Sequence, residues 1–295
     1  MARLMLDTCA ARREIGTLVP HARFLPVVCR RINDMEISVH FSSQGQGRPL
    51  LLVHGIGSSS RVWRPLLPPL ISERTIIAVD LPGHGQSQPE QDCETFAGLV
   101  GNLECFLEAE GLNGVDMVGF SLGGRLVLEL ARRGRAGSVV ALSPGGFWAG
   151  WERAFLQWTL LSSVSALRLL KGFVPGLAHT AVTRSAVLAQ LSARPWALDG
   201  DDVEAELVSF TATSTFNPLV IDLAAAPMQE GPAAPSTPKV TIGWGRHDRL
   251  CFPSQARRAK AAFPGASLRW FDHSGHYLIW DEPARALEII REGMR

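Results

Sequence analysis

Short, largely apolar runs recur along the sequence, and their spacing limits the folds that the chain can adopt. They cover residues 50–53, 75–79, 115–118, 139–142 and 240–244. Runs of this kind are typical of parallel strands that are buried on both faces. Helix-like segments lie between most of them, such as 96–110 and 122–133. The alternation predicts an α/β fold with an open, mostly parallel, doubly wound sheet, whose functional sites lie at the carboxyl ends of the strands.

The N-terminal part of the chain has a different pattern. Segments 27–32 and 36–41 flank Asn33-Asp34, a pair that favours a turn, and they predict an antiparallel hairpin at an edge of the sheet. Residues 1–24 carry several charged side chains among apolar ones, which interrupts the apolar core that a signal peptide requires. We interpret residues 1–24 as an N-terminal extension, either frayed or folded as a short surface helix.

One long segment interrupts the alternation of strands and helices. About ninety residues, 147–237, separate the strand-like run that ends near Leu142 from the next one, which is too many for a simple crossover. The segment has helical patterns at 152–171, 184–192 and 202–211, and it is rich in large aromatic residues. We interpret 147–237 as a helical cap over the carboxyl edge of a core formed by 25–146 and 238–295. Residues 227–238, rich in Pro, Gly and Ala, suit a linker or hinge back to that core.

The charge balance limits the class of partner. Lysine and arginine residues number 29, and aspartate and glutamate residues number 28. This balance argues against nucleic acid or an anionic membrane as the main partner, and it favours a small neutral molecule. No stretch approaches the roughly 18 uncharged apolar residues that a membrane helix requires. We therefore expect no transmembrane segment, while the oligomeric state stays open.

The cysteines give no sign of a covalent framework. Cys9, Cys29, Cys93, Cys105 and Cys251 are odd in number and widely spaced, and they form no Cys-x-x-Cys pair. Neither a disulfide framework nor a zinc site is indicated. The pattern favours a reducing compartment, so we expect a cytoplasmic protein that uses neither a metal nor a cofactor.

The pentapeptide Gly119-Phe120-Ser121-Leu122-Gly123 has the form of a nucleophile elbow. It lies where the apolar run 115–118 meets a segment with a helical apolar face, which is the strand-to-helix context that such a motif needs. The glycines allow a sharp turn without a Cβ clash, and the serine hydroxyl then points out of the turn. Ser121 is therefore the candidate nucleophile, placed at the N-terminus of a helix.

A nucleophilic serine needs a histidine base within hydrogen-bond reach and a carboxylate that fixes the tautomer of that base. Asp248 follows the run 240–244, and His276 follows the run 267–271. Both are thus expected on loops at the carboxyl ends of strands, near Ser121. Ser121, Asp248 and His276 form the candidate catalytic set.

Other residues compete for these roles. His273 lies only three residues before His276, but the glycine before His276 and the helix-start pattern after it favour His276. Asp222 and Asp272 are the other carboxylates considered. The loop after Leu142 reads Ser-Pro-Gly-Gly and offers no carboxylate.

The chain resembles the α/β-hydrolase superfamily from about Val27 to its C-terminus. Besides the elbow, the resemblance rests on a strand followed by His54-Gly55, on the loop Asp-Leu-Pro-Gly-His-Gly-Gln-Ser at 80–87, and on Gly-His at 275–276 with Asp-Glu-Pro at 281–283. The order serine, acid, histidine matches the order found in that superfamily. The resemblance implies the α/β-hydrolase fold with an inserted helical cap.

The resemblance also assigns roles to the turns around the site. It implies that the backbone N–H groups of Ile56 and Leu122 form the oxyanion hole, and that the loop 80–87 is structural. His54 and His84 belong to these turn motifs, and we interpret both as structural. Arg125 resembles a residue of certain lyases in the superfamily, but we interpret it as a solvated helix residue.

Serine in the elbow limits the reaction, because haloalkane dehalogenases and epoxide hydrolases of this superfamily use aspartate there. The resemblance implies a serine esterase or lipase that cleaves carboxylic esters of small to medium apolar substrates through an acyl-enzyme. Candidate substrate contacts are Phe120 and Tyr277 beside the triad, and Trp148 and Trp151 in the cap. The aromatic residues of the cap suit a site that sheds water, although they also suit packing between cap and core.

Three alternatives stay open on the same fold. A carbon–carbon bond hydrolase of ring-cleavage products usually has Asn before the serine and Trp after the base, where this chain has Phe120 and Tyr277. A perhydrolase shares the apolar residues of the elbow. A ligand receptor with slow turnover could retain the same triad.

Overall fold

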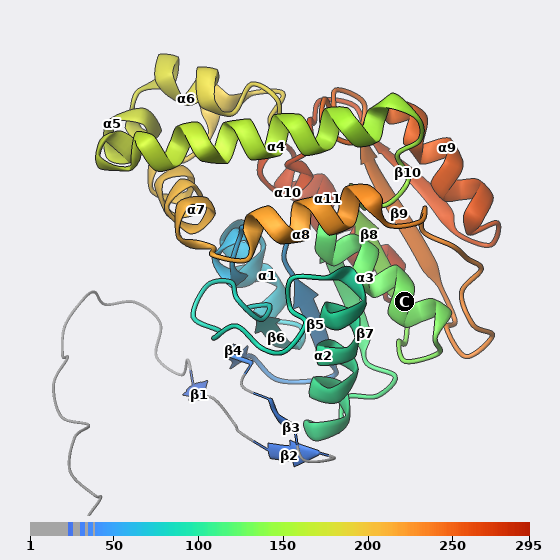
Figure 1. Ribbon diagram of the computed structural model, residues 1–295. Helices are drawn as coiled ribbons and strands as arrows, with labels where there is room; N and C mark the ends of the chain where they lie inside the picture. Colours follow the sequence, from blue (N-terminus) through green and yellow to red (C-terminus); the bar gives the residue numbers. More distant parts are fainter. Residues whose placement is uncertain (1–22, 26–29, 33–34, 38) are drawn as a thin grey trace, which may run out of the picture.

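The computed structural model describes residues 23–25, 30–32, 35–37 and 39–295 (Figure 1). Within them an eight-stranded sheet has the order β1-β4-β6-β5-β7-β8-β9-β10. β1 and β4 are antiparallel to their neighbours, and the other strands run parallel. The predicted mostly parallel, doubly wound sheet is confirmed. The strands are β1 (Arg23–Leu25), β4 (Phe41–Gln44), β5 (Pro49–Val53), β6 (Thr75–Val79), β7 (Asp116–Phe120), β8 (Val139–Leu142), β9 (Val240–Gly245) and β10 (Ser267–Phe271).

The predicted N-terminal hairpin forms, but not at the edge of the large sheet. β2 (Arg30–Ile32) and β3 (Met35–Ile37) pair antiparallel as a separate two-stranded sheet. Its turn, Asn33-Asp34, lies outside the described residues. The edge of the large sheet is formed by β1, which includes two residues of the expected N-terminal extension. Residues 1–22 of that extension also lie outside the described residues.

Helices cover both faces of the large sheet, which explains why its central strands are largely apolar. α3 (Leu122–Arg132) packs on β7 and β8, and α2 (Phe96–Ala109) packs on α3. α11 (Pro283–Gly293) packs on β8 and β9, and α9 (Pro253–Ala262) packs on β9 and β10. Leu50, Leu51, Leu52 and Val53 of β5 are completely buried. Burial on both faces is what the apolar runs in the sequence predict. The remaining short helices of the core are η1 (Ser60–Leu66), α1 (Leu67–Ile71) and α10 (Leu278–Asp281).

The inserted segment, residues 147–237, is helical (Figure 1, where most of its helices lie along the top of the view). Two expected helices agree with the observed ones within a few residues, at α4 and α7. The expected helix 184–192 starts and ends later than α6, and α8 was not anticipated, since Pro218 in its first turn disguises the pattern. The helices are α4 (Trp151–Leu169), η2 (Lys171–Phe173), α5 (Val174–His179), α6 (Ala181–Val187), η3 (Pro195–Ala197), α7 (Gly200–Ala212) and α8 (Phe216–Ala225).

The exit from the inserted segment is held against the core. The backbone N–H of Ala234 donates to the carbonyl of Ala131, and the Thr237 hydroxyl donates to the same carbonyl at 3.2 Å. The N–H of Gln229 donates to the carbonyl of Gly146. This Pro- and Gly-rich stretch is therefore hydrogen-bonded to the end of α3 and to the loop after β8.

Within the described part of the chain, every helix taken alone is too short or too polar to cross a membrane. α4 and the following η2-α5 segment pass that test of length and composition only as a pair, which is bent by 72°.

Candidate active site

Ser121 occupies a sharp turn between β7 and α3. Its backbone has φ 55° and ψ −114°, a conformation that non-glycine residues rarely adopt and that costs about 1–3 kcal/mol. A Cβ on Gly119 would lie 2.1 Å from the carbonyl oxygen of Gly123, and a Cβ on Gly123 would lie 2.1 Å from that of Val53. The turn therefore requires both glycines. The N–H of Ser121 donates to the carbonyl of Leu142 at 2.9 Å, which fixes the turn to β8.

The structure brings Ser121, Asp248 and His276 together. Nε2 of His276 lies 2.9 Å from Oγ of Ser121, and Nδ1 of His276 lies 2.9 Å from Oδ2 of Asp248. All three side chains are buried. Each follows the carboxyl end of a strand, namely β7, β9 and β10. The three expected residues therefore form a continuous hydrogen-bonded chain from carboxylate to hydroxyl.

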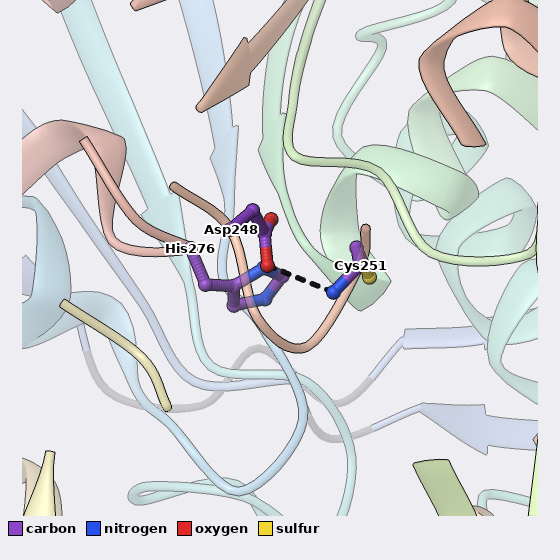
Figure 2. Close-up of side chains that lie close together, drawn as sticks. All are labelled: Asp248, Cys251 and His276. Carbon is purple, nitrogen blue, oxygen red and sulfur yellow. Dashed lines mark hydrogen bonds and ion pairs between the residues drawn. The ribbon is translucent and has the colours of Figure 1, made fainter. Parts of the chain in front are cut away.

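The loop after β9 holds the carboxylate of Asp248 in place. Oδ1 of Asp248 accepts hydrogen bonds from the backbone N–H groups of Leu250, at 2.9 Å, and Cys251, at 2.8 Å (Figure 2 shows the second). Oδ2 is left to face His276. The two backbone donors thus hold the carboxylate of Asp248 in one orientation, with its other oxygen toward the imidazole.

Asp281, which belongs to the family motif at 281–283, fastens the loop that carries His276. The carboxylate of Asp281 accepts from the N–H of Gly275 at 2.8 Å. It also accepts from the Ser192 hydroxyl and from the N–H of Ala193, both in the inserted segment. One buried carboxylate thus ties the catalytic histidine loop to the inserted segment.

A thiol lies beside the acid and the base. Potential ligand atoms of Asp248, Cys251 and His276 lie within 4.8 Å of one another, a separation that a metal ion could bridge (Figure 2). Burial holds the pKa of the Cys251 thiol well above its usual range, so the thiol keeps its proton. Both nitrogens of His276 and both oxygens of Asp248 already have hydrogen-bond partners. These donors fit a catalytic triad better than a metal centre.

The two residues expected to form the oxyanion hole lie on either side of Ser121. Ile56 lines the same cavity as Ser121, and a Cβ on the preceding Gly55 would lie 3.1 Å from the Cβ of Ser121. Leu122 is the first residue of α3, where backbone N–H groups lack an acceptor within the helix. Ile56 thus shares a cavity with Ser121, and Leu122 directly follows Ser121 in the chain.

His54 holds the first of these turns. Its Nδ1 lies 2.7 Å from the carbonyl of Gly55, and its Nε2 accepts from the N–H of Leu81 at 2.9 Å. Burial lowers the pKa of His54, so the ring is neutral and can serve as both donor and acceptor. Asp80 supports the adjoining loop by accepting from the N–H groups of Ser60 and Gln86. This geometry agrees with a structural role for the 80–87 loop.

A cavity of about 200 Å³ opens over Ser121 and His276. Phe120 and Tyr277, two of the expected substrate contacts, line it from the core. Its other walls come mostly from the inserted segment, namely Leu160, Val164 and Leu167 of α4, residues 186–191, and Leu207 and Phe210 of α7. The inserted segment thus covers the carboxyl ends of the strands and gives the cavity an apolar surface.

Trp148 and Trp151, the other two expected substrate contacts, lie elsewhere. Trp148 is buried against Gly145 and near the guanidinium of Arg125. Trp151 is 66% exposed and packs on Phe155 and Phe252. Both precede the part of α4 that reaches the cavity, so their aromatic side chains serve packing.

Arg125 is buried, and its interpretation as a solvated helix residue is wrong. Its guanidinium lies 4.0 Å from the ring centre of Phe96 and donates to the carbonyl of Pro227 at 2.8 Å. It therefore joins α3 to α2 and to the exit of the inserted segment.

Neither competing carboxylate reaches His276, since Asp222 accepts from the N–H of Phe96 and Asp272 forms an exposed ion pair.

Sequence reasoning missed Glu206 of α7, the carboxylic acid among the described residues that line the cavity. It is only 3% exposed, and its carboxyl group accepts from the Tyr277 hydroxyl at 2.6 Å and from the Ser58 hydroxyl at 2.9 Å. Burial raises the pKa of Glu206 to about 7. A signal was present, because Glu206 shares a helical face with the apolar residues 203, 207 and 210. A carboxylate at such a position is buried when the helix packs.

Comparisons with known proteins agree with this fold. Residues 50–289 match the model of the alpha/beta hydrolase family. The chain is 31% identical over 250 residues to the dihydrolipoyllysine-residue acetyltransferase component of an acetoin cleaving system of Cupriavidus necator, covering 81% of this chain and only 62% of that protein. Over 96 residues, 32% of this chain, it is 36% identical to a pimeloyl-[acyl-carrier protein] methyl ester esterase of Legionella pneumophila and covers 36% of it. A thermophilic esterase from Thermogutta terrifontis has a similar fold, with a TM-score of 0.71 at 19% identity over 90% of this chain and 96% of the other.

Proposed function

Because the chain belongs to the alpha/beta hydrolase family, we propose that it is a serine hydrolase that cleaves carboxylic esters of small to medium apolar substrates through an acyl-enzyme. The observation that carries the proposal is the pair of 2.9 Å contacts that joins Ser121, His276 and Asp248 at the floor of an apolar cavity. The esterases among the similar proteins support it.

The first half of the reaction forms the acyl-enzyme. Nε2 of His276 takes the proton of the Ser121 hydroxyl while Oγ attacks the carbonyl carbon of the ester. Asp248 stabilises the imidazolium that results. When the tetrahedral intermediate collapses, the carbon–oxygen bond to the alcohol breaks, and His276 delivers its proton to the leaving oxygen.

The negative charge of the tetrahedral intermediate requires donors on the side away from His276. We assign this role to the backbone N–H groups of Ile56 and Leu122. The N-terminus of α3 adds the positive end of a helix dipole at the same place. In enzymes of this type, one such donor contributes about 10²–10³-fold to kcat.

The second half releases the acid. A water molecule gives a proton to Nε2 of His276 and attacks the acyl carbonyl. Collapse of the second intermediate breaks the bond to Oγ, and His276 returns the proton to Ser121. Ser121, Asp248 and His276 end in their starting states, so the cycle needs no cofactor.

The cavity sets the kind of substrate. Its apolar walls and its volume of about 200 Å³ suit a short acyl chain or alcohol group that leaves water on binding. Phe120 and Tyr277 lie next to each other and beside His276, with ring centres 5.2 Å and 6.4 Å from that of the imidazole and 5.2 Å from one another. We propose that these two rings contact the substrate next to its carbonyl group.

A labelling experiment tests the machinery directly. Incubation with a fluorophosphonate, followed by peptide mass mapping, should place the label on Ser121, and the His276→Ala variant should lose the label. Label on another residue would contradict the assignment of the nucleophile.

Turnover of p-nitrophenyl acetate, butyrate and octanoate tests the reaction. We expect activity on at least one of these esters that disappears in the Ser121→Ala variant. Turnover of dienone ring-cleavage products in their place would identify a carbon–carbon bond hydrolase. Absence of Ser121-dependent turnover, despite labelling, would identify a receptor with the same triad.

A further inference from the structure

Three polar groups of the cavity take no part in the bond-making and bond-breaking steps of the proposed reaction. Glu206 reaches the cavity from α7, Ser58 from the loop after Ile56, and Tyr277 from the residue after His276. The three are joined, because the Tyr277 hydroxyl donates to Oε1 of Glu206 at 2.6 Å and the Ser58 hydroxyl donates to Oε2 at 2.9 Å. We call these three residues the polar subsite.

The carboxyl group of Glu206 has unused capacity to accept hydrogen bonds. An ionised carboxylate offers about four lone-pair positions, and the two hydroxyl groups occupy two of them. The surrounding residues of α7, Val203, Leu207 and Phe210, are apolar and buried. A carboxylate that is almost completely buried among such groups gains much from a further donor, because little water reaches it.

The polar subsite also determines what the cavity disfavours. Among the described residues, neither a lysine nor an arginine lines the cavity, and Glu206 is its sole carboxylic acid. A second carboxylate would thus meet a like charge without a cation to balance it. A neutral hydroxyl group meets no such penalty.

We infer that Glu206, Ser58 and Tyr277 bind a hydroxyl group of the substrate and select against a carboxylate at the same place. This inference rests on the proposed esterase function and adds a substrate class, namely neutral esters that carry a hydroxyl group near the carbonyl. The polar subsite lines the same cavity of about 200 Å³ as Ser121 and His276, and the ring centre of Tyr277 lies 6.4 Å from that of His276. The hydroxyl therefore belongs on a carbon close to the ester group. Burial raises the pKa of Glu206 to about 7, which also suits a neutral partner over a charged one.

Three p-nitrophenyl esters with four acyl carbons test the inference. They are the butyrate, the 3-hydroxybutyrate and the hydrogen succinate. The hydroxyl group of the second ester and the free carboxylate group of the third are both attached to the third acyl carbon. At pH 8 we expect the wild-type enzyme to have a higher kcat/KM on the hydroxybutyrate than on the butyrate. Its kcat/KM on the succinate should be at least tenfold lower than on the butyrate.

The Glu206→Gln variant removes the charge and keeps the size and one oxygen acceptor. We expect its succinate-to-butyrate ratio of kcat/KM to rise at least tenfold and its preference for the hydroxybutyrate to fall severalfold. Glu204→Gln is the matched control, since Glu204 lies on the same helix, is bonded to His179 and does not line the cavity. It should leave both ratios as in the wild type. Because the readout is a ratio, a general loss of activity cannot imitate the effect.

The outcomes separate this inference from the proposed function. Ratios that stay within twofold of the wild type in Glu206→Gln, with butyrate still hydrolysed, overturn the polar subsite and leave the esterase intact. If no ester is hydrolysed, calorimetric binding of butyramide and 3-hydroxybutyramide replaces turnover. A lower Kd for the hydroxylated amide in wild type than in Glu206→Gln then supports the subsite, whereas equal affinities refute it.

Discussion

Ser121, Asp248 and His276 lie on turns that follow strands of the core sheet. The cavity wall that faces them is made of helices of the inserted segment, which contact one another through side chains. The elbow is hydrogen-bonded to β8, and the acid loop gives two N–H groups to its own carboxylate. The inserted segment instead exposes large apolar side chains, among them Trp151, Trp158 and Phe173. The backbone of the core therefore holds the three side chains in place, whereas the inserted segment supplies most of the apolar wall that faces them.

The largest difference between the two regions should appear in catalysis. Asp248→Asn keeps the size of the side chain but favours the wrong tautomer of His276, so we expect kcat to fall about 10⁴-fold. Asp272→Asn makes the same chemical change at an exposed ion pair and should leave kcat within twofold. Steady-state kinetics on p-nitrophenyl butyrate measures both. Equal rates in the two variants would remove Asp248 from the triad.

Glycine substitutions test how rigidly each region holds its backbone. Gly119→Ala would bring a Cβ to within 2.1 Å of the Gly123 carbonyl oxygen, so we expect a loss of about 4 kcal/mol in the free energy of unfolding. Gly176→Ala, in α5, has no atom within 4 Å of the new Cβ and should stabilise the protein by about 0.5–1 kcal/mol. Urea unfolding compares them, and a similar loss in both would show that the elbow is not specially constrained.

The same contrast explains what the sequence could predict. The buried strands give continuous apolar runs, and the turn at Ser121 needs glycines at fixed spacing, so both leave local signatures. Asp248 and His276 were expected near Ser121 because each lies on a loop that follows a strand. Their mutual distances depend on strand order, which no local pattern states.

The inserted segment was predicted less well, for a physical reason. A helical pattern shows which residues share a face but not what covers that face, so Trp148 and Trp151 were expected at the substrate although one is packed away from the cavity and the other is exposed. Glu206 was missed because its partners, Ser58 and Tyr277, are 148 and 71 residues distant in the chain. The start of α8 was hidden by Pro218, which a first helical turn tolerates.

Glu206 of the inserted segment, which is hydrogen-bonded to Ser58 and Tyr277 of the core, should make the free energy of unfolding depend on pH. The pKa of Glu206 is about 7 in the folded protein, against 4.5 for a glutamate in its ordinary surroundings. Folding therefore favours the protonated form: this contribution to stability is complete below pH 4.5 and is lost as the pH rises through 7. Glu206→Gln does not titrate there. We expect the stability of wild type relative to this variant to fall by about 2–3 kcal/mol between pH 5 and pH 8. A constant difference across that range, measured by urea unfolding, would contradict the raised pKa.

The smallest expected effects are on the free energy of unfolding, when one tryptophan in each region is replaced by phenylalanine. Trp244 of β9 is fully buried, and its Nε1 donates to the carbonyl of Cys251 at 2.9 Å, in the loop that holds Asp248. Trp244→Phe leaves that carbonyl without its donor and leaves a small void, so we expect a loss of about 2 kcal/mol. Trp158 of α4 is 71% exposed, and Trp158→Phe should change the free energy of unfolding by no more than about 0.5 kcal/mol. A substantial loss at Trp158 would mean that the outer face of α4 is packed in solution, and that the inserted segment is as tightly held as the core.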